Sequence, residues 1–259
     1  MKTLLIIPVR MQSSRFPGKP LKLICGIPMV RHCYERALLS KGIDVTYIAT
    51  CDKEIYDYAS SISANVIMTN NKHERATDRT AEALLKVENE LQTKFDVVIM
   101  LQGDEPMISP NSITEMVQNF RKKEVNIANI ISKLNNIKSF NDKNNVKVVF
   151  DENMNAMYFS REPIPSNWKK NAESFFYMQV GVIGFRRKEL IWFLKTKQTP
   201  LENIESVDMN RVLENGKKIK LVINDSLTLG VDTKEELQEI EKMLKKDPIT
   251  RKYIKNPNA

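Results

Sequence analysis

The chain opens with the apolar stretch Thr3-Leu4-Leu5-Ile6-Ile7-Pro8, and Val9-Arg10-Met11-Gln12-Ser13-Ser14-Arg15-Phe16-Pro17-Gly18-Lys19-Pro20 follows directly. The first part is typical of a strand that a parallel sheet buries on both faces. The second part is polar and begins where that strand should end. Because open α/β sheets bind ligands beyond the carboxyl ends of their strands, this stretch predicts both the fold class and the place of a ligand site.

Apolar runs and helical spacing alternate through the first half of the chain. Strands are expected at 45–50, 66–69 and 97–101, and helices at 29–39, 54–62, 78–91 and from Ser109-Pro110 onward. This βαβ alternation predicts an α/β protein with a mostly parallel, doubly wound sheet.

The second half has a different texture. Strands are expected at 146–150, 157–160 and 175–185 with few helices between them, which indicates an antiparallel insertion at about 126–186. A capping box at Thr199-Pro200-Leu201-Glu202 predicts a helix that stops at Asn215-Gly216, and a second box begins at Thr233. With no repeat or low-complexity linker, residues 1–259 are expected to form a single domain whose tail frays from Asp247.

Composition narrows the function classes. Forty basic and 32 acidic residues give a net charge of +8, but much of the excess lies in lysine pairs typical of solvated faces, so no nucleic-acid partner is expected. Three cysteines without paired spacing and two histidines argue against a disulfide framework or a Cys/His metal cluster. The opening apolar run is too short for a membrane span or a signal-peptide core, so a soluble, cytoplasmic protein without a membrane partner is predicted.

The loop after the first strand carries three cations among small residues. Arg10, Arg15 and Lys19 alternate with Ser13, Ser14 and Gly18, a combination suited to phosphate oxygens. The loop matches neither the P-loop nor the dinucleotide-binding glycine pattern, so an ordinary polar loop remains the alternative.

Two acidic residues are candidate ligands for Mg²⁺. Asp104 lies in Gln102-Gly103-Asp104-Glu105-Pro106, directly after the strand at 97–101, and Asp232 lies in Gly230-Val231-Asp232-Thr233. Magnesium usually takes one or two protein carboxylates and completes its shell with water and phosphate oxygens. Asp232 has an alternative role, because an acid at a helix start also stabilises the helix dipole.

Seven motifs in order then resemble the CMP-Kdo synthetase (3-deoxy-manno-octulosonate cytidylyltransferase) family. They are P-V-R-M-Q-S-S-R-F-P-G-K-P, H-E-R-A-T-D-R, L-Q-G-D-E-P, V-K-V-V-F-D, Y-F-S-R-E-P-I-P, P-L-E-N-I-E and G-V-D-T, and they cover nearly the whole chain. The resemblance implies a Rossmann-like nucleotidyltransferase fold, usually a homodimer, and it assigns the insertion at about 126–186 to dimerisation and sugar binding. It also implies an enzyme that uses Mg²⁺ to transfer CMP from CTP to the anomeric hydroxyl of Kdo or a Kdo-like 2-keto-3-deoxy sugar acid. Pyrophosphate is released, and the product serves lipopolysaccharide or surface polysaccharide synthesis.

The same resemblance assigns roles to individual residues. Catalysis falls to Arg10, Lys19, Asp104 and Asp232, the last two as metal ligands. Nucleotide binding falls to Arg10, Ser14, Arg15, Lys19, Arg79 and Gln102. Sugar binding falls to Arg75, Arg161, Gln179, Phe185, Asp208 and Met209.

The sugar positions depart from the family pattern. Where the family usually shows H-x-S-G-T-[DE]-R, this chain has Arg75-Ala76 in place of the small pair, and Gln179, Phe185 and Met209 replace a histidine, a tyrosine and a glutamine. Lost hydroxyl and amide groups favour a changed acceptor, such as an amino- or deoxy-modified relative of Kdo, while drift with compensating contacts is the alternative.

Two other classes of function are alternatives to this prediction. A non-catalytic nucleotide-binding regulatory dimer of the same fold is the main alternative, and the intact Asp104, Asp232, Arg10 and Lys19 argue against it. A Rossmann oxidoreductase would need a glycine-rich turn after the first strand, which the segment from Val9 to Gly18 lacks.

Overall fold

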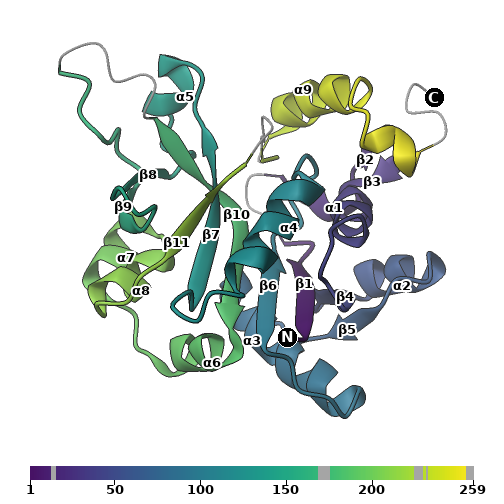
Figure 1. The fold of residues 1–259 in the computed structure, drawn as a ribbon. Helices are drawn as coiled ribbons and strands as arrows, with labels where there is room; N and C mark the ends of the chain where they lie inside the picture. Colours follow the sequence, from purple (N-terminus) through teal and green to yellow (C-terminus); the bar gives the residue numbers. More distant parts are fainter. Residues whose placement is uncertain (13–15, 169–175, 225–229, 232, 255–259) are drawn as a thin grey trace.

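The computed structural model describes residues 1–12, 16–168, 176–224, 230–231 and 233–254. Its centre is one sheet with the strand path β11-β7-β10-β6-β1-β4-β5 (Figure 1). Along this path β10 alone runs antiparallel to its neighbours within the described residues, and the other pairings are parallel. The strands are β1 (Thr3–Val9), β4 (Val45–Thr50), β5 (Val66–Met68), β6 (Val97–Leu101), β7 (Ile127–Lys133), β10 (Tyr177–Arg186) and β11 (Lys220–Ile223).

The apolar opening explains the place of β1 in the sheet. Residues 4–7 are fully buried, because β1 pairs with β4 on one side and β6 on the other while helices cover both faces. One face packs against α1 (Met29–Leu38), α2 (Lys53–Ser61) and α4 (Pro110–Asn119). The other packs against α3 (Ala76–Glu90) and α6 (Arg187–Lys195). The predicted mostly parallel, doubly wound α/β fold is confirmed.

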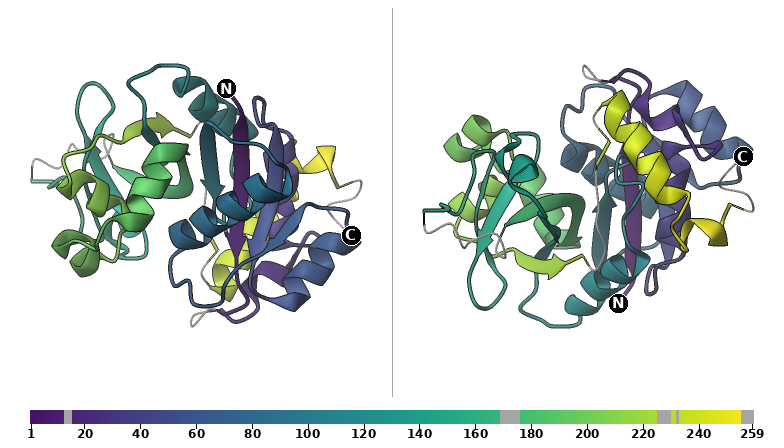
Figure 2. Two further views of the ribbon diagram at one scale, coloured as in Figure 1. Left: turned by 90° about the horizontal axis from the view of Figure 1, so that it is seen from below. Right: turned by 90° about the horizontal axis from the view of Figure 1, so that it is seen from above.

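The antiparallel part is smaller than the sequence indicates. Strands β7 and β10, which lie inside the expected 126–186 insertion, belong to the central sheet, and β7 pairs in parallel with β11. The hairpin of β8 (Lys147–Phe150) and β9 (Ala156–Ser160) branches from β10 and lies on the same side as α7 (Pro200–Glu205) and α8 (Met209–Glu214), which Figure 1 labels and Figure 2 shows from two further directions. The helix α5 (Ile137–Asn141) precedes this hairpin.

The helix expected from Thr199 to Asn215 is interrupted. The Thr199 capping box forms and starts α7 (Pro200–Glu205), but Ser206 adopts a left-handed conformation with φ 53°, and α8 (Met209–Glu214) starts afresh. Sequence spacing alone missed this break, because serine is not a residue that usually takes a left-handed conformation.

The C-terminal segment folds back on the N-terminal half. The predicted Thr233 capping box forms and begins α9 (Lys234–Leu244), which packs on the small pair β2 (Leu23–Ile24) and β3 (Ile27–Pro28) (Figure 1). The 3₁₀ turns η1 (Lys19–Leu21) and η3 (Thr250–Lys252) lie on this side. The expectation of a frayed tail from Asp247 is wrong as far as residue 254. In the described part of the chain, no helix is both long and apolar enough to cross a membrane.

Candidate active site

A cavity of about 770 Å³ opens where β1 and β6 end and α3 begins. It lies at the carboxyl edge of the parallel strands, as the order of the elements predicts. Its charged lining is dominated by cations, with two carboxylates among them. The charged side chains are those of Arg10, Lys19, Lys72, Glu74, Arg75, Arg79 and Asp104.

An ion pair joins the loop after β1 to the loop after β6. Lys19 Nζ lies 2.7 Å from Asp104 Oδ2 and donates a second hydrogen bond of 2.6 Å to the Val231 carbonyl. The Val231 amide in turn donates to the Asp104 carbonyl at 3.2 Å. Three segments that are distant in sequence therefore meet at one point, where Lys19 neutralises a carboxylate that is itself partly exposed to the cavity.

Gly103 allows the two loops to come this close. A Cβ atom at Gly103 would lie 2.0 Å from Cγ1 of Val9, a separation that real structures do not tolerate. Any side chain here would push the ends of β1 and β6 apart and move Asp104 away from Lys19. The neighbouring Gln102 lines the cavity, and its backbone N–H donates a 2.8 Å hydrogen bond to the Gly181 carbonyl.

Two arginines approach the cavity from different depths. Arg10 is exposed, and its Nη1 donates to the His73 carbonyl at 3.4 Å. Arg79 is only 2% exposed, and its Nη1 donates to the Asn70 carbonyl at 3.3 Å. Its Nη2 has no hydrogen-bond partner within the described residues. A buried charged donor left unpaired is costly, so Arg79 is a candidate to bind an acceptor atom.

The loop before α3 is held by Glu82, which the sequence analysis did not single out. Its carboxylate accepts hydrogen bonds from the Asn70 amide and the His73 ring, and Lys86 Nζ lies 2.8 Å from it. Partial burial acts to raise the pKa of Glu82, but the bonds from Lys86, Asn70 and His73 outweigh it and lower the pKa to about 2. Glu82 thereby fixes the loop that carries Lys72, His73 and Arg75 into the cavity.

Replacing Glu82 with glutamine should loosen this loop and lower the stability of the fold by roughly 1 kcal/mol near neutral pH. The effect should depend on pH with a definite sign. The depressed pKa means that the carboxylate stabilises the protein above its ordinary value of 4.5, and that this contribution is lost as the pH falls toward about 2. Denaturant unfolding of the wild type and Glu82→Gln at several pH values measures the difference in their free energies of unfolding. A stability difference that stays constant from about pH 6 to about pH 3 would contradict the assignment.

A second charged cluster borders the cavity on the side of α7 and α8. Arg75 Nη2 lies 4.0 Å from Glu202 Oε1, and the fully buried Glu202 is paired with Arg211 through bonds of 2.7 and 2.5 Å. Asp208 Oδ2 accepts a 2.6 Å bond from the Thr77 hydroxyl. Burial raises the pKa of Asp208, while the Thr77 hydrogen bond and the positive charge of Arg75 oppose that rise.

Comparison with known proteins identifies the family. The profile of a family described as cytidylyltransferase matches residues 4–219. The chain belongs to this cytidylyltransferase family.

Relatives of this cytidylyltransferase carry two related names. A 3-deoxy-manno-octulosonate cytidylyltransferase of Thermodesulfovibrio yellowstonii is 39% identical over 94% of this chain and 98% of its own length. An 8-amino-3,8-dideoxy-manno-octulosonate cytidylyltransferase of Shewanella amazonensis is 38% identical over 95% of this chain and all of its own length. A solved structure of CMP:2-keto-3-deoxy-manno-octonic acid synthetase complexed with CTP matches with a TM-score of 0.85 and 34% identity, over 94% of this chain and 98% of that one.

The structure brings together part of the predicted site of the cytidylyltransferase. The side chains that line one cavity are those of Arg10, Lys19, Arg75, Arg79, Gln102 and Asp104. Three further predicted residues, Ser14, Arg15 and Asp232, lie outside the described residues.

Two predicted sugar contacts are core residues instead. Phe185 is fully buried on β10, opposite Val98 near the amino end of β6, and packs near Phe193. Met209 is also fully buried, in the same apolar cluster. The prediction that these two side chains line the sugar pocket is wrong, because their strand register and helix face turn them into the core.

Two others have partners away from the cavity. Gln179 Nε2 donates to Asn129 Oδ1 at 2.6 Å. Arg161 Nε donates to the Glu205 carbonyl at 2.7 Å and its Nη1 to the Lys143 carbonyl at 2.9 Å, so it braces the hairpin end against α7. Asp208 does not line the cavity either, but it is linked through Thr77 to the start of α3, which does.

Proposed function

We propose that this cytidylyltransferase transfers CMP from CTP to Kdo or a Kdo-like 2-keto-3-deoxy sugar acid and releases pyrophosphate, for the synthesis of lipopolysaccharide or another surface polysaccharide. The observation that carries the proposal is the cation-rich cavity closed by the Lys19–Asp104 pair, at the strand ends where this fold binds ligands. The names of the full-length relatives support it. Both substrates are anions, and a cavity with this charge balance attracts both.

The residues of the cavity suit an in-line displacement. The anomeric oxygen of the acceptor forms a bond to the α-phosphorus of CTP while the bond from that phosphorus to the bridging oxygen of the pyrophosphate breaks. Positioning and neutralisation of charge dominate such reactions. Lys19 and Arg10 lie where they can neutralise phosphate oxygens, and the unpaired Nη2 of Arg79 can bind a further acceptor atom.

The donor set fits a magnesium ion at Asp104. Its Oδ1 has no partner among the described residues, and carboxylate oxygen is the hard ligand that Mg²⁺ prefers. We propose that Asp104 holds Mg²⁺ together with Asp232. The bound ion would supply charge neutralisation at the phosphates and lower the pKa of a coordinated hydroxyl group.

The test is pyrophosphate release from each of four nucleoside triphosphates, combined with a panel of acceptors. CTP should be strongly preferred over ATP and GTP, with UTP the nearest competitor. The acceptor panel should contain Kdo, its 8-amino-8-deoxy derivative and a nonulosonic acid, because the relatives carry both octulosonate names. CTP binding without turnover on any acceptor would favour the regulatory dimer, and equal rates with purine triphosphates would contradict the proposal.

We also propose a cytoplasmic homodimer. The most exposed large apolar side chains of the described residues are Trp168, Ile204 and Met157, at 88%, 77% and 64% exposure. All three belong to the part of the chain from β9 to α7. Such side chains often mark protein contacts. Light scattering should give twice the monomer mass of 29.9 kDa, and Ile204→Glu should shift it toward the monomer.

A further inference from the structure

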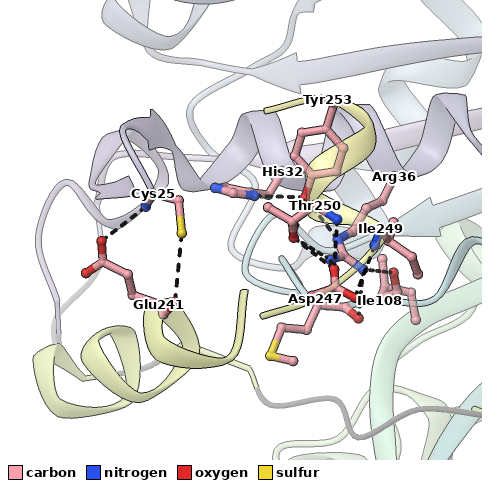
Figure 3. Close-up of polar contacts among 10 residues, drawn as sticks. Cys25, His32, Arg36, Ile108, Glu241, Asp247, Ile249, Thr250 and Tyr253 are labelled. Carbon is pink, nitrogen blue, oxygen red and sulfur yellow. Dashed lines mark hydrogen bonds and ion pairs between the residues drawn. The ribbon is translucent and has the colours of Figure 1, made fainter. Parts of the chain in front are cut away.

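The C-terminal segment is fastened to α1 by a buried polar cluster (Figure 3). His32 is fully buried, and its ring bridges the Ile24 carbonyl at 2.8 Å and the Tyr253 hydroxyl at 2.9 Å. Burial, the largest effect, lowers the pKa of His32 to about 4, so the ring is neutral near pH 7. Both ring nitrogens of His32 are thus paired inside the protein, and satisfied buried polar groups of this kind fix one arrangement of the segments that they join.

Arg36 is the centre of this cluster. Its side chain is 2% exposed and forms an ion pair with Asp247. It also donates to Thr250 Oγ1 and the Tyr253 hydroxyl, both at 3.2 Å. Burial acts to raise the pKa of Asp247, but Arg36 and the bonds from Thr250 hold it below its ordinary value. The carboxylate is therefore charged near neutral pH, and the pair is intact.

The same guanidinium also reaches the loop that bears Asp104. Arg36 Nη1 donates to the Ile108 carbonyl at 3.1 Å and to the Met107 carbonyl at 3.4 Å (Figure 3 shows the bond to Ile108). These carbonyls follow the Gln102–Pro106 turn directly. One side chain of α1 thus joins the C-terminal segment to the end of the Asp104 loop.

The C-terminal segment meets the site at two further points. At its start, Val231 accepts from Lys19 and donates to the Asp104 carbonyl. In its middle, Glu241 accepts a 3.2 Å bond from the amide of Cys25, which follows η1 and β2 (Figure 3). Both loops that carry Lys19 and Asp104 are therefore braced by the segment that Arg36 and Asp247 anchor.

We propose that Arg36, Asp247 and Tyr253 are positioning residues for cytidylyl transfer. They hold the C-terminal segment as a brace that sets the separation of Lys19 and Asp104. The proposal rests on the proposed function. None of the three side chains lines the cavity, so their effect on the reaction must pass through the two loops. Displacement of a catalytic group by about 1 Å can cost about a hundredfold in rate, which makes such bracing consequential.

A matched control separates positioning from stability. Glu88 is a carboxylate of the same kind, with a side chain 1% exposed and bonds of 2.8 and 2.9 Å to Arg187. It lies near the end of α3, away from the cavity. Asp247→Asn leaves the buried Arg36 without its carboxylate, and Glu88→Gln removes a buried carboxylate that pairs with Arg187 and Lys94, so both variants should lower the Tm. Only the first pair is connected to Asp104.

The experiment compares Asp247→Asn, Tyr253→Phe and Glu88→Gln with wild type, well below each Tm. Asp247→Asn should lower kcat about tenfold or more and Tyr253→Phe about threefold, while Glu88→Gln stays within about twofold of wild type. Hydrogen exchange gives a readout that needs no turnover. The amides of Glu105 and Ile108, which hydrogen-bond within the Asp104 loop, should exchange faster in the first two variants only.

Several outcomes would overturn the proposal. If Asp247→Asn matches Glu88→Gln in both kcat and loop exchange, the cluster is only a structural clamp. If Asp247→Asn does not fold, Tyr253→Phe, which removes a single oxygen, decides by the same two readouts. If the wild-type protein does not transfer CMP, the proposed function is wrong. If the variants are active and hydrogen exchange in the Asp104 loop is unchanged, only the positioning role of the C-terminal segment is wrong.

Discussion

Replacing Asp104 with asparagine should lower kcat by more than about a hundredfold while leaving the fold intact. The amide keeps the size and shape of the side chain but removes the negative charge that Lys19 Nζ meets at 2.7 Å. It also removes the carboxylate that we assign to Mg²⁺. Because Asp104 is partly exposed, the change creates no cavity in the core. Pyrophosphate release measured over a range of Mg²⁺ concentrations gives kcat for the variant. The Mg²⁺ concentration needed for half-maximal activity should also be higher than for the wild type.

Asp57→Asn is the control for the Asp104 variant. Asp57 pairs with Lys53 on the exposed face of α2, and its side chain is 56% exposed. Surface pairs of this kind contribute little, so turnover should be unchanged. Asp232→Asn should resemble Asp104→Asn if both carboxylates hold the metal. Near-normal turnover in Asp104→Asn, with Mg²⁺ still required, would contradict the assignment.

Local pattern was enough to predict most of the first half of the fold. Strands β1 and β6 are almost wholly apolar runs, and β4 is rich in β-branched residues. The helices between them have one apolar face each, so the strand and helix patterns are easy to separate. Strand β7 escaped this reasoning because Asn129 interrupts it. That side chain is fully buried and donates to the Val180 and Val182 carbonyls, a partnership that becomes visible only once β10 lies beside it.

Contacts between residues that are distant in sequence explain where the other predictions from the sequence differ from the structure. The tail beyond Asp247 is polar and looks frayed in isolation, yet it is ordered by Arg36, 211 residues away. Lys19, Gln102 and Asp104 could be predicted as a group because parallel strand ends meet at one edge. Phe185 and Met209 could not be placed in this way, since the face that a strand or helix residue presents depends on register and helix start. Glu82 gave no sequence signal beyond its place on a helix.

Replacing Lys19 should also cause a large loss of activity. Its ammonium is bound by Asp104 Oδ2 and the Val231 carbonyl, and its side chain is only 11% exposed. Methionine fills a similar volume without charge, so Lys19→Met should change electrostatics more than packing. With one cation fewer against the triphosphate and the departing pyrophosphate, kcat/KM for CTP should fall by at least about a hundredfold.

Lys19→Met and Asp104→Asn should differ in the Mg²⁺ concentration that gives half-maximal activity. This difference tests the roles of Lys19 and Asp104 separately. Without the Lys19 ammonium, the Asp104 carboxylate attracts a divalent cation more strongly, so half-maximal activation of Lys19→Met should need no more Mg²⁺ than the wild type. Lys19→Arg keeps the charge but must fit a larger planar group into a nearly closed site, and it should recover only part of the activity. If Lys19→Met turns CTP over normally, the ammonium serves only to pair with Asp104. If instead Lys19→Met needs more Mg²⁺, as Asp104→Asn should, then Lys19 acts by holding Asp104 in place rather than by meeting the phosphates.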